Sequence, residues 1–209
     1  MKEDNLFVES DTLYFPRVGR QNTEQVLSLV KARALELGIS TIVVASTSGR
    51  TGVQAVEFFS GFKVVVVTLP YGYPRPGNRL REDYKAQILE KGGHVLTTTQ
   101  ALAGVSRAVR RKLGTYQVGE IVAHALRIFG QGMKVVCEIT VMAADAGLIR
   151  TDEEVIVIAG RAGGADTAAV VKPVHAQDFF DLQIREILCK PRQWPQPTQL
   201  PPLQEPMLV

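Results

Sequence analysis

One segment limits the possible fold more than any other: a strand pattern that leads directly into a hydroxyl-rich turn and then a helix. Residues 41–45 are Thr-Ile-Val-Val-Ala, residues 46–49 are Ser-Thr-Ser-Gly, and a helical pattern follows from Thr51. The first turn of such a helix has unpaired backbone N–H groups and a partial positive charge. The segment therefore predicts a phosphate-binding turn. Its candidate contacts are Ser46, Thr47, Ser48, Gly49, Arg50 and Thr51.

Helical and strand patterns alternate along the remaining chain. Apolar residues recur at helical spacing between Val26 and Leu37, with Asn22 and Thr23 as the expected cap and Gly38 as the stop. Further strands are expected at residues 63–68, 94–97, 154–159, 168–172 and, more weakly supported, 183–189. Further helices are expected at residues 80–91, 101–113, 117–129 and 134–146. This alternation predicts a three-layer α/β sandwich in a single domain over residues 1–189, with a Pro- and Gln-rich tail at 190–209.

The composition excludes several classes of protein. A formal net charge of only +3 gives no sign of a nucleic-acid partner, and Cys137 and Cys189 have neither CxxC spacing nor a nearby histidine pair. The acidic N-terminus lacks a hydrophobic signal region, and no apolar run approaches membrane-spanning length. We therefore expect a reduced, cytoplasmic protein without a metal site or a membrane partner.

The turn at residues 46–51 does not match the common nucleotide motifs. No lysine follows Gly49 as a P-loop requires, and the G-x-G-x-x-G pattern of dinucleotide sites is absent. The strand at 63–68 ends in Thr68 rather than in an acid that could bind a ribose hydroxyl. What remains is a site for one phosphate monoester. The alternative is an ordinary strand-to-helix turn capped by Ser48 or Thr51.

Several separate segments resemble the C-terminal α/β domain of pyruvate kinase. Residues 43–51 look like its phosphate turn, and residues 155–171 look like its final strand, glycine-rich loop and strand. Residues 137–147, 160–167 and 179–189 look like segments of small stand-alone proteins of this type, which are mostly archaeal and of undefined role. The resemblance extends over residues 12–192. It implies an α/β/α sandwich with a mixed, mostly parallel sheet.

The resemblance also suggests a ligand and excludes an activity. It implies flavin mononucleotide (FMN) as the ligand, with its phosphate on the 46–51 turn. Pyruvate kinase chemistry takes place on a separate barrel of about 250 residues, for which this chain has no room, so pyruvate kinase activity is not expected. Where relatives tend to have His-x-Leu-Ser-Gly, this chain has Gln100-Ala-Leu-Ala-Gly104, so no role of that histidine or serine carries over.

Other candidate ligand contacts lie after other strands. Thr68 and Thr98 follow strands at the sheet edge where ligands bind in open α/β folds. In the loop after residue 159 the candidates are Gly160, Arg161 and Gly163, although a plain hairpin connection is the alternative. We expect Asp166 and Thr167 to fix that loop through bonds to the backbone.

Glu138 and Asp145 share one face of an apolar helix. Each carboxylate therefore needs a partner, which is a ligand group or a cation such as Arg161. Tyr71 and Tyr73 flank Gly72 in a proline-rich loop, either as a lid over a ring or as a surface turn.

The basic cluster of Arg107, Arg110, Arg111 and Lys112 could attract an anionic ligand or RNA, but no aromatic or RNA-reading motif accompanies it, so a solvated helix face is the preferred interpretation. The three histidines are interpreted as structural. Three functions stay open: a module that binds a phosphorylated small molecule, a flavin-dependent oxidoreductase, and a ligand-free regulatory or oligomerising domain. No catalytic set is recognisable, and self-association into a homo-oligomer also stays open.

Overall fold

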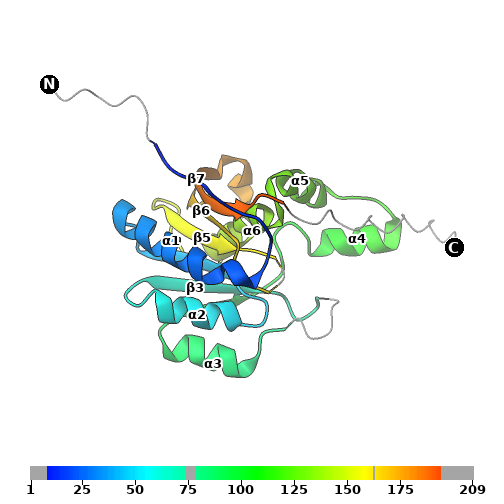
Figure 1. The fold of residues 1–209 in the computed structure, drawn as a ribbon. Helices are drawn as coiled ribbons and strands as arrows, with labels where there is room; N and C mark the ends of the chain where they lie inside the picture. The colour runs from blue at the N-terminus through cyan, green and yellow to red at the C-terminus, as the bar shows by residue number, and fades with distance from the viewer. Residues whose placement is uncertain (1–8, 74–78, 162, 194–209) are drawn as a thin grey trace.

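A mixed sheet lies at the centre of the computed structural model, which describes residues 9–73, 79–161 and 163–193 (Figure 1). In these residues seven strands follow the order β1-β7-β6-β5-β2-β3-β4. Strands β2, β3, β4 and β5 run parallel to one another, and β6 is antiparallel to both of its neighbours. The strands are β1 (Leu13–Phe15), β2 (Thr41–Ala45), β3 (Lys63–Thr68), β4 (His94–Thr97), β5 (Val155–Ala159), β6 (Thr167–Lys172) and β7 (Gln183–Pro191). The mixed, mostly parallel sheet confirms the expected fold class.

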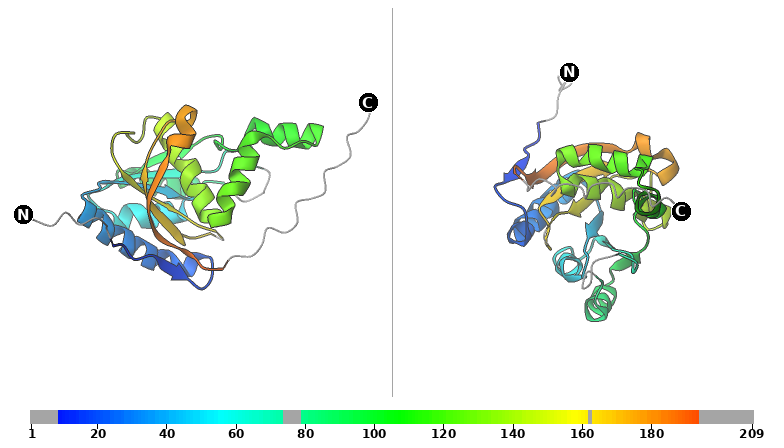
Figure 2. Two further views of the ribbon diagram at one scale, coloured as in Figure 1. Left: turned by 90° about the horizontal axis from the view of Figure 1, so that it is seen from above. Right: turned by 90° about the vertical axis from the view of Figure 1, so that its right-hand side faces the viewer.

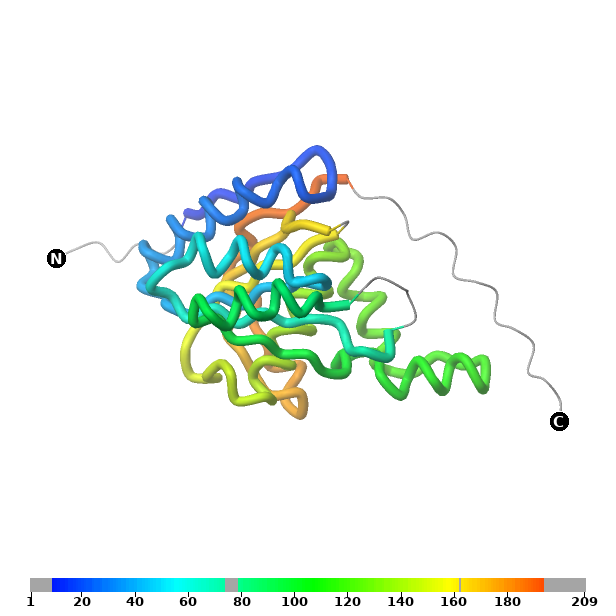
Figure 3. Tube along the Cα trace, turned by 90° about the horizontal axis from the view of Figure 1, so that it is seen from below, coloured from blue at the N-terminus to red at the C-terminus, as the bar shows by residue number. Residues whose placement is uncertain are grey.

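Helices cover both faces of this sheet (Figure 2). One face carries α1 (Thr23–Leu37) and α2 (Arg50–Phe58), and α3 (Glu82–Glu90) packs beside α2. The other face carries α6 (Gln131–Asp145). Two further helices, α4 (Val105–Leu113) and α5 (Val118–Leu126), form an arm, and α4 projects away from the sheet (Figure 3). Short 3₁₀ turns are η1 (Arg20–Asn22), η2 (Arg127–Phe129) and η3 (Ala176–Asp181).

Alternating side chains of the strands build two apolar cores. In β2, Ile42 and Val44 join the core under α1 and α2, whereas Val43 joins the core under α6. All three are fully buried, and burying one such side chain stabilises the fold by about 1.5–3 kcal/mol. This is the physical reason that an apolar run on both faces indicates a covered parallel strand.

The structure corrects the expected cap of α1. The Asn22 side chain does not cap the helix; its Nδ2 donates to the Arg17 carbonyl at 2.8 Å. The Thr23 hydroxyl accepts instead from the Ala165 amide at 3.1 Å, which ties α1 to the loop after β5. The stop at Gly38 is confirmed, since its φ of 68° is left-handed.

Two strand boundaries also differ from the expectation. Strand β1 was not predicted, because three residues are too few to show a period. Strand β7 continues to Pro191, where it pairs with Phe15 of β1, so Lys190 and Pro191 belong to the sheet and not to the tail expected from residue 190. Residues 194–209 lie outside the described part of the chain.

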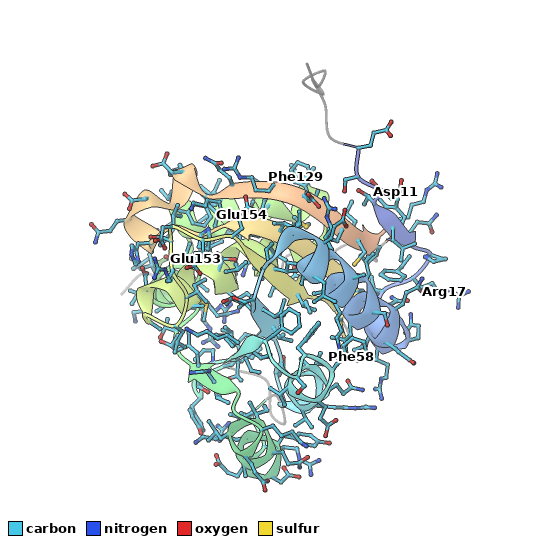
Figure 4. All side chains as sticks on the ribbon, turned by 90° about the vertical axis from the view of Figure 1, so that its left-hand side faces the viewer. Asp11, Arg17, Phe58, Phe129, Glu153 and Glu154 are labelled. Carbon is cyan, nitrogen blue, oxygen red and sulfur yellow. The ribbon has the colours of Figure 1, made fainter. Side chains whose placement is uncertain are left out.

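The two edges of the parallel strands differ in charge. Figure 4, viewed from the side away from α4, labels Glu153 and Glu154 just before β5, at the amino edge. Their carboxylates pair with Arg150 and Arg185, at 3.1 and 3.3 Å. The carboxyl edge instead carries the 46–51 turn and a cavity whose lining includes five cations and two carboxylates.

Candidate functional site

A cavity of about 530 Å³ lies at the carboxyl edge of β2, β3 and β5, between the sheet, α6 and the α4–α5 arm. This volume is within the range of about 300–1,000 Å³ typical of small-molecule sites. Nine of the expected site residues line it: Ser46, Thr47, Ser48, Thr51, Thr68, Glu138, Gly160, Arg161 and Gly163. Three do not: Gly49, Arg50 and Thr98. The topology thus brings most of the candidate contacts to one hollow.

The 46–51 turn presents several backbone donors. Among the described residues, none accepts a hydrogen bond from the amides of Thr47, Ser48, Gly49 or Thr51. Two nearby amides are occupied, because the Ser46 amide donates to the Val67 carbonyl and the Gly52 amide to the Ser46 hydroxyl, at 3.0 and 3.1 Å. Ser46 therefore serves the turn itself, while the four other amides fit an anion at the α2 N-terminus.

Gly49 has a different role from the expected one. Its φ of 97° requires glycine, and a Cβ there would lie 2.7 Å from Tyr84 Cβ and 2.9 Å from Leu80 Cδ1. The missing side chain thus makes room for α3 and not for a ligand. A bulky residue at position 49 would disturb the packing of α2 on α3, and Arg50 is exposed to solvent outside the cavity.

The loop after β5 is held mainly by its own bonds. Asp166 is fully buried and accepts from the amides of Gly19 and Arg161 and from the Thr167 hydroxyl, at 3.1, 3.2 and 2.9 Å. This confirms the bonds to the backbone expected for Asp166, whereas the Thr167 hydroxyl bonds the Asp166 carboxylate and not the backbone. Burial raises the pKa of Asp166 above its ordinary value, and the three donated bonds oppose that rise.

The glycines of this loop are required for packing within the protein. A Cβ at Gly160 would lie 2.3 Å from the Gly164 carbonyl oxygen, and one at Gly164 would lie 2.2 Å from Arg20 Cα. Gly163 differs, because it has a φ of 83° and open space beside it. Of the three glycines, Gly163 therefore leaves room for a ligand. At the neighbouring strand ends, the Thr68 and Thr97 hydroxyls bond each other at 2.6 Å.

Glu138 on α6 finds its partner one helical turn away. Its carboxylate pairs with Lys134 and also accepts from the Leu102 amide at 3.2 Å and from Gln100 Nε2 at 3.4 Å. The Lys134 and Glu138 side chains are 5% and 2% exposed, so both charges are removed from water. The pKa of Lys134 is lowered chiefly by this burial, against the attraction of Glu138. The pairing with Arg161 that the sequence suggested does not form; Asp145 bonds His175 and the Ala176 amide instead.

The α4–α5 arm points cations into the cavity, which corrects the expectation of a solvated face. Arg107 and Arg110 line the cavity, whereas Arg111 and Lys112 are exposed. Arg110 pairs with Glu120 at 2.7 Å, and the other oxygen of Glu120 is buried without a hydrogen-bond partner among the described residues. Such an oxygen is costly unless a ligand donor reaches it.

Part of the cavity lining is less polar. It comprises Leu69, Tyr73, Tyr116, Val135, Ile139 and Met142. Tyr73 therefore contributes to the cavity, whereas Tyr71 is exposed. The rest of the proline-rich loop, residues 74–78, lies outside the described residues. His124 lines the cavity as well, and burial lowers its pKa, followed by the charge of Arg127.

Sequence reasoning missed Arg107, Arg110, Arg127 and Lys134 as cavity residues. For Lys134 a signal was present, since a lysine four residues before a glutamate on an apolar helix indicates a pair on one face. For Arg107 and Arg110, nothing in the sequence indicates whether the side chains face the cavity or the solvent.

Comparison with known proteins agrees with this architecture. The family model described as pyruvate kinase, alpha/beta domain, matches residues 24–171. Two crystal structures of pyruvate kinase from Cryptosporidium parvum are similar at 14% and 12% identity, with TM-scores of 0.36 and 0.35. Each match covers 72% of this chain. A third structure, the same enzyme in complex with ADP, is 15% identical over 73% of this chain, with a TM-score of 0.33.

The chain spans only 22–23% of the length of those pyruvate kinases. The described residues form the sandwich alone and include no catalytic barrel. Within them, no helix combines the length and apolarity needed to cross a lipid bilayer. The family match covers well over half of the sequence, and the chain belongs to the pyruvate kinase α/β-domain family.

Proposed function

We propose that this protein binds a phosphorylated small molecule, and that the ligand is FMN with its phosphate on the Thr47–Thr51 side of the turn. The observation that carries the proposal is a set of four amides at the α2 N-terminus for which the described residues offer no acceptor, all in the turn that borders the cavity. A phosphate dianion accepts several hydrogen bonds at once and is stabilised by the partial positive charge of the helix.

The remaining cavity suits the other parts of FMN. The less polar lining residues, which include Tyr73, Tyr116 and Met142, suit a flat aromatic ring. When bound, FMN would supply electron-transfer chemistry, and these residues would bind and orient it. A plain sugar phosphate leaves these less polar residues without a partner.

The decisive measurement is the affinity for FMN against that for riboflavin, which lacks the phosphate. We expect FMN to bind at least tenfold more tightly, and we expect Thr47→Asp to remove that advantage while riboflavin affinity stays unchanged. Thr47 is exposed, so an aspartate there repels the phosphate without burying a charge. The matched control is Ser40→Asp, an equal charge change on an exposed residue at the amino edge of β2.

Equal affinities for FMN and riboflavin, or an unchanged preference in Thr47→Asp, would refute the phosphate placement. A colourless purified protein whose melting temperature does not respond to FMN would favour the ligand-free domain instead.

A further inference from the structure

Two guanidinium groups in the cavity lack a carboxylate partner among the described residues. Arg107 donates to Gln100 Oε1 at 3.3 Å, and Arg127 donates to Gln131 Oε1 at 2.8 Å, so both partners are neutral amides. The two carboxylates of the cavity, Glu138 and Glu120, are already paired with Lys134 and Arg110.

These two arginines also lie close enough to repel each other. Burial is the main cause that lowers the pKa of Arg127; the negative charge of Glu138 opposes this effect, and the positive charge of Arg107 adds to it. The positive charges of Arg127 and Arg107 also lower the pKa of Lys134. Repulsion between half-buried like charges is unfavourable, and an anion placed between them converts it into attraction.

Their placement on the fold is separate from the phosphate turn. Arg107 lies on α4 and Arg127 on η2, where the arm meets α6, whereas the turn belongs to the sheet edge. The Arg107 guanidinium also lies 5.3 Å from the centre of the Tyr73 ring, which restricts its position. The cavity therefore has cationic groups at the arm in addition to the amides at the sheet.

We propose that Arg107 and Arg127 form a second anion subsite, which takes a phosphate or carboxylate group distinct from the phosphate on the turn. This inference rests on the proposed function for the first phosphate only. The anion is either the far end of the same ligand or a separate small molecule. FMN has a single phosphate, so with FMN on the turn a separate acidic molecule would occupy the arm.

The test counts inorganic phosphate ions bound per chain by titration calorimetry. We expect two in the wild-type protein, one in Thr47→Asp and one in the double variant Arg107→Gln/Arg127→Gln. The matched control is Arg111→Gln, an exposed arginine on the same helix, which should keep both sites. The variant Arg107→Lys/Arg127→Lys retains the charges and should retain the second site.

The outcomes separate the two proposals. A single phosphate in the wild-type protein that Thr47→Asp removes and Arg107→Gln/Arg127→Gln leaves intact overturns the second subsite alone. If the bound phosphate is lost in the double variant and Thr47→Asp has no effect, the turn is refuted as the first phosphate site. If Arg107→Lys/Arg127→Lys loses binding together with the glutamine variant, despite wild-type circular dichroism, charge is not the determinant and the subsite is refuted.

A second titration identifies the source of the anion. Protein saturated with FMN should still bind one phosphate, because FMN has no second anionic group to place at the arm; binding of none would overturn a separate anion beside FMN.

Discussion

Replacing Glu138 with glutamine should expose the energetic cost of the buried ion pair on α6. Glutamine keeps one carbonyl oxygen, which can still accept from the Leu102 amide, but it removes the charge that compensates Lys134. With side chains only 5% and 2% exposed, neither group can regain water without a local opening. Breaking a buried pair in this way costs roughly 3–5 kcal/mol of unfolding free energy. In a domain of this size that corresponds to a fall in Tm of about 6–20 °C.

The pH dependence distinguishes this mechanism from simple misfolding. Lys134 in Glu138→Gln has a folded-state pKa far below the unfolded value of about 10.4, since burial already lowers it in the wild-type protein. Between those two values the unfolded chain binds a proton that the folded chain does not, so stability rises as pH rises. The loss of unfolding free energy in Glu138→Gln is therefore largest near neutral pH and becomes smaller toward pH 10.

Urea unfolding of the wild-type protein, Glu138→Gln and Lys134→Met/Glu138→Gln measures both effects. The double variant removes the uncompensated charge and should recover most of the loss, because a neutral side chain of similar size at position 134 has no charge to desolvate. The reasoning is refuted if Glu138→Gln stays within about 1 kcal/mol of wild type, or if the double variant is no more stable than the single one.

Three shorter predictions follow from other parts of the structure. Burial raises the pKa of Cys137 to about 11 and that of Cys189 to about 12, so neither thiol should react with Ellman's reagent at pH 8 until the protein is unfolded; rapid native labelling would contradict this. A Cβ on Gly132 would lie 2.0 Å from Thr167 Oγ1, so Gly132→Ala should lose roughly 1–3 kcal/mol in urea unfolding, and Gly72→Ala serves as a control, because Gly72 has no positive φ and a Cβ there would meet no neighbour. Asp166→Asn should lower Tm, because the three groups that donate to Asp166 would face a neutral amide in place of a charged carboxylate. An unchanged Tm would exclude a stabilising role for this carboxylate.

The strands of the sheet could be predicted well from the sequence, for a definite reason. Residues 64–68 form a continuous β-branched run, and β3 occupies Lys63–Thr68 in the structure. Apolar side chains on both faces leave such a segment no stable place other than a covered sheet. Strand β1 gives no such signal, because its three residues are ordered by pairing with β7, whose residues lie far away in the sequence.

The phosphate turn could be located from the sequence, but the roles of its residues could not. A strand followed by hydroxyl residues and a helix predicts where free amides lie, and four of them have no acceptor in the described structure. The local pattern does not contain α3, so it could not show that Gly49 makes room for Tyr84 and Leu80. It also could not show that the Ser46 hydroxyl is used within the turn.

The arm shows a second limit of local patterns. No residue of α4 is buried, so its polar spacing is that of any exposed helix. Whether Arg107 and Arg110 meet solvent or a cavity depends on the path of the chain through α5 and η2 back to α6. That path is a property of the tertiary structure, and periodicity within nine residues cannot report it.

The cations of the cavity account for the formal net charge of the chain. Among the described residues, five cations and two carboxylates line the cavity: Arg107, Arg110, Arg127, Lys134, Arg161, Glu120 and Glu138. The whole chain has 24 Lys and Arg residues and 21 Asp and Glu residues, so the other 19 of each sign balance. The formal excess of three positive charges is thus located in the cavity. A nucleic-acid surface requires a basic stripe on the outside of the protein, whereas an excess of positive charge around a hollow of about 530 Å³ supports the proposed binding of a small anion.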